Sequence, residues 1–411
     1  MRYVLGVHLG TTRTTAAVCR SGGPHWGRPE VVPLGGRFPW LDSVLHVGLT
    51  GDVLTGQAAL RRAATEPDRI ARGPLRRTGD AVPFVLGDMS YPAETLAAAL
   101  IGWVADRVAD AEGTDPERIV VTHPPGWSGH RRGALHEALD AAQLPAVLAL
   151  PSPIAAAESH HAREHVDVGA TLAVCRIGGE GTDAALLRRA PRGFELLAHA
   201  EGPEHAAGTH LDDLLVRHLV RAAGADEKDP AAMARLRGAC TAAKERLSQV
   251  PETTVLDDVP LTRSEFDELA RPVLASAISS LERLASTVLS GDLAAAVLVG
   301  GTARTPLAAQ LAETMLSCPV AVDHDPGTAL CRGAALAARP VPEPEPTRES
   351  KSTSLVSGSY ELPVVYRGDD LDDIEPPPER PPVEITPLEP PRRRFSLARK
   401  AASTTDRDEE R

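Results

Sequence analysis

A glycine followed by two threonines lies between two apolar runs near the start of the chain, in the stretch YVLGVHLGTTRTTAAV of residues 3–18. Strand, tight turn and strand in this order are typical of a hairpin that binds phosphate, which makes Gly10, Thr11 and Thr12 candidate contacts. His8 stands where the strand meets the turn, at a position where such hairpins usually carry a carboxylate that organises magnesium. The turn therefore predicts phosphate binding, with an unusual residue beside it.

The same order of elements returns from Thr171, where the strand TLAVCRI is followed by the turn GGEGT and the strand DAALLRR. Gly178, Gly179 and Gly181 are the candidate phosphate contacts of this second hairpin. The repeat suggests a duplicated domain in which each half offers one hairpin to a cleft between the halves.

A third glycine turn, in AAVLVGGTARTPL of residues 295–307, leads from a strand into a helix and contains Gly300 and Gly301. A single turn of this kind is more often a plain hairpin or loop. Two phosphate hairpins followed by a Gly-Gly turn form a much more specific set than any one of them.

Between these turns the chain alternates short β-like runs with helical ones. Residues 92–113 have helical apolar spacing and end at a glycine, and residues 118–127 form a buried strand followed by a proline turn. Residues 41–48, LDSVLHVG, are expected to continue the first sheet. The alternation predicts an α/β protein with one lobe over residues 1–165 and a second over residues 166–338.

The composition limits the class of protein. Of 411 residues, 42% are hydrophobic and only 3% aromatic, which predicts a large core built mainly from Ala, Leu and Val. The net charge of −12 argues against nucleic acid as a partner. Five scattered cysteines without a C-x-x-C pair argue against disulfides and zinc and for a reducing compartment. No run approaches about 18 apolar residues, so we expect a cytoplasmic protein without a membrane span.

The composition changes sharply near residue 340. Residues 340–411 contain 13 prolines, in blocks such as PVPEPEP and EPPPERPP. Such a segment offers too little apolar surface to offset the entropy of ordering. We therefore expect residues 339–411 to be a disordered, proline-rich tail.

Taken together, the motifs resemble those of the heat-shock protein 70 family of the actin-like ATPase superfamily. VLGVHLGTTRTTAAV is similar to the first phosphate loop of the family, RIGGEGTDAALL to the second, and DPGTALCRGAALAA to the closing helix. The likeness runs in unbroken order over about residues 1–338. It implies an actin-like ATPase (ribonuclease H-like) fold, with two lobes around a cleft that holds ATP or ADP.

The resemblance also implies contacts on the adenosine side of that cleft. AAKERLS is similar to the helix that clamps adenosine, and VLVGGTARTPL to the loop beneath the base and ribose. A side chain at the second glycine of that loop would fill the space of the nucleotide. The positions that match are Gly208, Lys244, Ser248, Gly300, Gly301 and Arg304.

The catalytic positions depart from the family pattern. The family carries aspartates that hold magnesium and its waters at the positions of His8 and Arg176. A lysine that positions the attacking water aligns with Leu75, with Arg76 one residue away as the alternative, and a catalytic glutamate aligns with Ser152. No residue is therefore a confident catalytic candidate, no metal ligand is expected, and the active site is interpreted as degenerate.

Charge at the phosphate end changes as well. Glu180 replaces the third glycine of the second loop, where it would oppose ATP unless Arg176 neutralises it. Like charges about 4 Å apart repel by roughly 1 kcal/mol in water and roughly 4 kcal/mol at an intermediate dielectric. His8 and Arg176 could contact phosphate oxygens directly, with the charge of His8 depending on pH.

Two other features have plainer interpretations. His160, His161 and His165 have a spacing that could suggest metal, but a solvated helix end is favoured. Lys244 beside Glu245 fits a surface charge pair as well as a nucleotide contact.

Three functions remain open. The favoured one is a chaperone-related protein that binds adenine nucleotide, with little dependence on magnesium and without effective hydrolysis, and acts on an unidentified protein partner. The second is a slow ATPase in which Thr11, Thr12 and Asp183 organise water and metal. The third is a nucleotide-free scaffold. We do not expect client-peptide chaperoning of the family's usual kind, because the proline-rich residues 340–411 cannot replace its β-sandwich substrate domain and helical lid.

Overall fold

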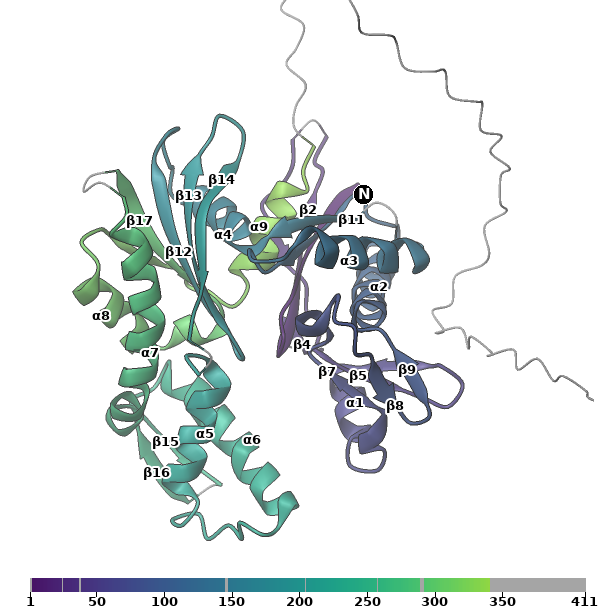
Figure 1. Ribbon diagram of the computed structural model, residues 1–411, viewed down its shortest axis with the longest axis vertical. Coiled ribbons are helices and arrows are strands. Elements are labelled where there is room, and N and C mark those ends of the chain that lie inside the picture. Colours follow the sequence, from purple (N-terminus) through teal and green to yellow (C-terminus); the bar gives the residue numbers. More distant parts are fainter. Residues whose placement is uncertain are drawn as a thin grey trace, which may run out of the picture. The chain divides into compact units, whose positions relative to one another are not determined.

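The computed structural model describes residues 2–23, 25–36, 38–144, 147–203, 205–256, 258–288 and 292–340. The tail expected to be disordered lies outside the described residues from residue 341 onward. Figure 1 shows the described elements, which up to Arg339 belong to one compact unit.

The first large sheet holds the N-terminal hairpin at its centre. Its strand order is β11-β10-β1-β2-β3, and β4 also pairs with β2. β1 runs antiparallel to β2 and parallel to β10, which in turn runs parallel to β11. The strands are β1 (Tyr3–Leu9), β2 (Arg13–Arg20), β3 (Glu30–Val31), β4 (Trp40–Asp42), β10 (Ile119–His123) and β11 (Val147–Pro151).

The second large sheet repeats this plan. Its order is β14-β13-β12-β17-β18, in which β12 is antiparallel to β13 and parallel to β17. Each sheet thus places an antiparallel hairpin beside parallel strands, which confirms the predicted repeat. The strands are β12 (Thr171–Ile177), β13 (Thr182–Arg189), β14 (Phe194–Glu201), β17 (Leu293–Val299) and β18 (Val320–Val322).

Smaller elements extend the first half, and one of them corrects a prediction. Of residues 41–48, which were predicted to continue the first sheet, only Leu41 and Asp42 in β4 do so, whereas β5 pairs with β6 and β7 in a separate sheet. The chain turns away at Ser43, whose N–H donates to the carbonyl oxygen of Thr12 at 2.9 Å. The remaining elements of this half are β5 (Val44–Val47), β6 (Val53–Thr55), α1 (Gly56–Arg62), η1 (Pro67–Arg69), β7 (Ile70–Arg72), η2 (Pro74–Arg77), β8 (Phe84–Leu86), β9 (Met89–Tyr91), α2 (Ala93–Glu112) and α3 (Gly129–Ala141).

The second half carries a mainly helical extension. A capping box at Thr262 begins its longest described helix, because the threonine side chain accepts from the N–H of Glu265 and the glutamate side chain accepts from the N–H of Thr262. Its elements are α5 (Gly208–Leu219), α6 (Pro230–Leu247), β15 (Glu252–Val255), β16 (Val259–Thr262), α7 (Arg263–Ala285), η3 (Gly301–Arg304) and α8 (Pro306–Met315).

Two alanine-rich helices connect the sheets. α4 (Ser152–His161) follows the first sheet in the chain, yet its alanines pack in one cluster with Leu172 and Val174 of the second sheet. α9 (Ala329–Ala337) follows the second sheet, yet it also packs against Val4 and Ala17 of the first. The two helices lie side by side in Figure 1.

The close contacts that α9 makes with α4 and with β1 require glycine. A Cβ atom at Gly333 would lie 1.7 Å from the carbonyl oxygen of Ala155, and one at Gly6 would lie 2.1 Å from the backbone nitrogen of Ala335. Both distances are far below van der Waals contact, so the backbones meet without an intervening side chain.

Within the described part of the chain, no helix has both the length and the apolar character needed to cross a membrane.

We expect Gly333→Ala to lower the free energy of unfolding by about 1–3 kcal/mol, because the added methyl group must push α9 away from α4. Urea denaturation measures this change. The control is Gly238→Ala in α6, where a Cβ atom meets nothing within 4 Å, and which should be neutral or stabilising by up to about 1 kcal/mol. Equal stability of the Gly333 variant and the wild type would contradict the close crossing.

Candidate functional site

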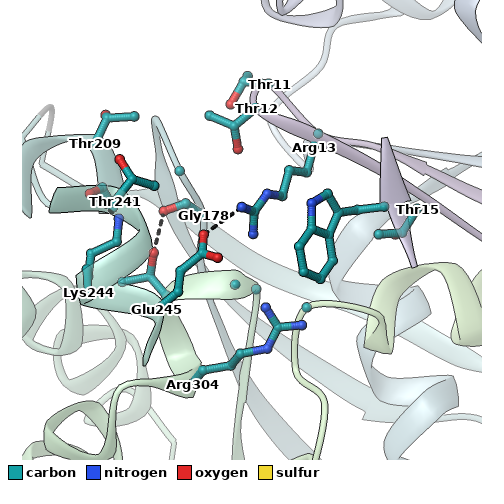
Figure 2. A pocket seen from close by; sticks show the side chains of 18 of the residues that line it. Thr11, Thr12, Arg13, Thr15, Gly178, Thr209, Thr241, Lys244, Glu245 and Arg304 are labelled. Atoms are coloured by element: carbon teal, nitrogen blue, oxygen red, sulfur yellow. Dashed lines mark hydrogen bonds and ion pairs between the residues drawn. The ribbon is translucent and has the colours of Figure 1, made fainter. Parts of the chain in front are cut away.

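Both hairpin turns, the turn after β17 and the helix α6 line one cavity of about 340 Å³. Figure 2 shows it from close by. His8 and Arg176, predicted at the roots of the hairpins, also lie in its wall. The predicted contacts that line the cavity are Gly10, Thr11, Thr12, Gly178, Gly179, Gly208, Lys244, Ser248, Gly300, Gly301 and Arg304.

The two hairpins are closed in the same way. The N–H of Gly10 donates to the carbonyl oxygen of Arg13 at 3.1 Å, and the N–H of Gly178 donates to that of Gly181 at 3.0 Å. Gly181 thus closes the second turn but is not among the residues that line the cavity. A Cβ atom at Gly179 would lie 2.4 Å from Oγ1 of Thr12, so the tips of the hairpins touch.

His8 is held as a neutral side chain. Its Nδ1 lies 2.7 Å from Oγ1 of Thr122 on the neighbouring strand β10. Burial, together with the positive charge of Arg176, lowers the pKa of His8 to about 3. The imidazole is therefore uncharged at neutral pH, and the pH-dependent charge suggested by the sequence would appear only in strongly acidic solution.

Arg176 is bound within its own hairpin. It lies opposite Asp183 in the register of β12 and β13, and its Nε donates to Oδ2 of Asp183 at 2.5 Å while a second guanidinium nitrogen also contacts this oxygen. Glu180 instead faces Nη1 of Arg76 at 3.7 Å. Arg176 therefore does not meet the condition of neutralising Glu180, because it is bound to Asp183, which lies beside it on the adjacent strand.

Leu75 and Ser152 lie away from the cavity wall. Leu75 is buried in η2 as part of the first core. Ser152 is buried at the first residue of α4, and its Oγ has no hydrogen-bond partner among the described residues. Neither position brings a polar group to the residues that line the cavity.

Lys244 fixes α6 to the start of α5. Its Nζ donates to the carbonyl oxygen of Gly208 at 2.9 Å and lies 2.8 Å from Oδ1 of Asp212. One interpretation of the sequence was a surface charge pair between Lys244 and Glu245. The structure does not form this pair. Glu245 is instead 2.6 Å from Nη2 of Arg13.

The turn after β17 leaves space in front of it. Gly300 has φ +95°, and a Cβ atom there would lie 2.4 Å from the carbonyl oxygen of Ile177. A Cβ atom at Gly301 would meet nothing within 4 Å, although this residue lines the cavity. Arg304 at the end of η3 forms an ion pair with Asp325. Gly300 is thus required by the backbone, whereas Gly301 keeps the cavity open.

Of the three histidines whose spacing could suggest metal, His160 is buried and His161 makes local contacts. Nδ1 of His161 accepts from the N–H of Val166 at 3.0 Å, and Nε2 lies 3.3 Å from Arg189. Across the residues that the structure describes, no group of three or more histidine, cysteine, aspartate or glutamate side chains is placed to hold a metal ion.

Comparison with known proteins agrees with the geometry. The family model described as Hsp70 protein matches residues 76–351. The chain is similar to the chaperone protein DnaK of Nitrosopumilus maritimus, with 28% identity over 82% of this chain and 56% of the relative. It is also similar to the protein of that name from Cenarchaeum symbiosum, with 27% identity over 82% of this chain and 54% of the relative. The protein of that name from Picrophilus torridus is 26% identical over 82% of this chain and 58% of the relative. The chain thus spans a little over half the length of these relatives.

The environment of His8 predicts how stability depends on pH. An unfolded chain protonates this histidine below a pKa of about 6.5, whereas the folded chain does so only near pH 3. Between these values the unfolded state binds more protons, so stability falls as the pH falls, by up to about 1.4 kcal/mol per pH unit. His8→Gln removes this contribution.

We therefore expect wild type to lose about 2 kcal/mol more than His8→Gln when urea unfolding at pH 7 is compared with pH 5. His130→Gln, on the exposed surface of α3, is the control and should behave as wild type. An equal loss in wild type and His8→Gln would show that His8 is not held neutral.

Proposed function

Since this chain belongs to the Hsp70 family, we propose that its cavity binds adenine nucleotide without magnesium-dependent hydrolysis and that the bound state acts through protein contacts. The fold is that of the actin-like ATPases, and proteins of the Hsp70 family bind ATP and ADP. The match covers a little over half of the relatives' length, so chaperone activity of the whole relatives is not assumed for this chain.

Nucleotide binding is supported by the shape of the cavity. The two glycine turns place Gly10, Gly178 and Gly179 in the cavity wall together with the hydroxyl-bearing Thr11 and Thr12. Such turns favour phosphate because they present several donors to an anion without a competing side chain. Gly301 and Ser248 line the same cavity, and the space in front of Gly301 suits the sugar and base.

The Arg176–Asp183 ion pair is the main observation in support of the proposed loss of hydrolysis. Magnesium takes oxygen ligands and is usually held by one or two carboxylates. At the two hairpin roots this chain presents the neutral imidazole of His8 and a carboxylate already bound by arginine. These groups do not fit magnesium, and phosphoryl transfer depends on charge stabilisation that the metal supplies.

A slow ATPase is the second candidate. Asp183 Oδ1 has no hydrogen-bond partner among the described residues, although the side chain is buried and Asp183 does not line the cavity. We favour the first proposal because the other oxygen of Asp183 is bound by Arg176 at 2.5 Å.

Calorimetric titration tests the proposal directly. We expect ATP and ADP to bind with affinities that differ by less than about threefold between magnesium and a chelator, and hydrolysis to equal the background without protein. Gly301→Val should weaken ATP by at least about tenfold, because the side chain enters the nucleotide's space, where a Cβ atom meets no protein atom within 4 Å.

The matched control is Gly129→Val at the start of α3, where a Cβ atom also meets nothing within 4 Å. It should bind ATP as wild type does. Strong magnesium dependence with turnover would favour the slow ATPase, and no binding of either nucleotide would overturn the proposal.

Restoring carboxylates should restore the metal before the reaction. His8→Asp with Arg176→Asp supplies two carboxylates, and a third change, Asp183→Asn, prevents repulsion between the carboxylate introduced at position 176 and the one that faces it across the hairpin. We expect ATP affinity to become magnesium-dependent while turnover stays low, because Leu75 and Ser152 still bring no polar group to the cavity. Full turnover in this variant would show that the other positions are not needed.

A further inference from the structure

An aromatic ring and an ion pair meet at one end of the cavity. The guanidinium carbon of Arg13 lies 4.3 Å from the centre of the Trp40 ring. The same guanidinium reaches Oε1 of Glu245 at 2.6 Å. Figure 2 shows Arg13 and Glu245 pointing toward each other.

Trp40 also stands between two hollows. A neighbouring cavity of about 460 Å³ shares part of its wall with the first. Their shared lining consists of Trp40, Glu245, Ser248, Arg304 and Thr305. The neighbouring cavity is otherwise lined in part by apolar Pro39, Pro306 and Val322. Phe38 stacks on this indole with ring centres 5.1 Å apart, and the rest of its planar apolar surface is offered to whatever fills the space beside it.

These contacts connect the two halves of the molecule. Arg13 begins β2 and Trp40 begins β4 in the first sheet, whereas Glu245 lies on α6 and Arg304 on η3 of the second half. The guanidinium of Arg304 lies 5.8 Å from the Trp40 ring centre. Trp40 is therefore approached by a cation from each half.

The Arg13–Glu245 ion pair is weak enough for a ligand to displace it. The side chains of Arg13 and Glu245 are 30% and 37% exposed, and water weakens an ion pair at such a site. A guanidinium on an indole at a partly exposed site is also a weak contact. A flat aromatic ligand gains more from the same face, since its stacking area is larger.

We propose that Trp40 is the stacking surface for the base of a bound nucleotide, and that the Arg13–Glu245 pair is a clasp that covers this surface until the base displaces it. This inference rests on the proposed nucleotide binding. Because every base has a planar face, Trp40 supplies affinity for the base as a class and little discrimination between adenine and guanine.

Calorimetry with ATP and inorganic tripolyphosphate separates the base from the phosphates. Trp40→Leu should weaken ATP by about 10- to 100-fold and leave tripolyphosphate unchanged, whereas Trp40→Tyr should stay within about threefold of wild type. ATP, but not tripolyphosphate, should quench tryptophan fluorescence in wild type. Trp103→Phe, a half-buried tryptophan of α2 outside the cavity, is the control and should keep the quenching.

The clasp is tested by Arg13→Gln with Glu245→Gln, which removes the pair without changing the net charge. ATP should bind about two- to fivefold more tightly, because the base no longer competes with the ion pair, and tripolyphosphate should bind as before. Unchanged or weaker ATP binding would overturn the clasp.

The outcomes separate this inference from the function on which it rests. If wild type binds ATP and Trp40→Leu binds it equally well, or loses ATP and tripolyphosphate alike, the stacking role is overturned and nucleotide binding stands. If wild type binds neither ATP nor ADP, the proposed function fails and the stacking role fails with it.

Discussion

The fold depends on a backbone contact that leaves no room for a side chain. At Gly333 and Gly6, α9 lies directly against Ala155 of α4 and against β1, with hypothetical Cβ atoms only 1.7 Å and 2.1 Å from backbone atoms. This contact joins the two repeated sheets at their inner faces. The hairpin of each sheet can then reach the same cavity, and the tips at Thr12 and Gly179 meet there.

Much of the fold could be predicted from the sequence, because its signals are local. Both hairpins, the turn after β17 and the helix over residues 93–112 follow from short patterns of apolar residues and glycines. The exception is residues 41–48. There the N–H of Ser43 hydrogen-bonds to the turn of the first hairpin and the chain leaves the sheet, which the composition of this stretch does not reveal. The repeated strand order also follows from the repeated motif.

The site was predictable in its backbone and less so in its charges. A glycine that is needed for close approach of the backbone has the same role whatever surrounds it, as Gly300 and Gly179 do. The role of a charged side chain depends on the partner that it contacts. Asp183 could have been matched to Arg176 from hairpin register, whereas Arg13 and Glu245 are 232 residues apart and no local pattern connects them.

The exchange of α4 and α9 between the sheets has a consequence during synthesis. Residues Val4 and Ala17 of the first sheet are covered by a helix that spans Ala329–Ala337, so most of the described chain must be made before this helix can dock. Until then, one face of the first sheet stays open to water or to other proteins. A nascent chain of this protein therefore exposes apolar surface for nearly the whole time that a ribosome needs to complete the second half, which gives cellular holding factors a long interval in which to bind it.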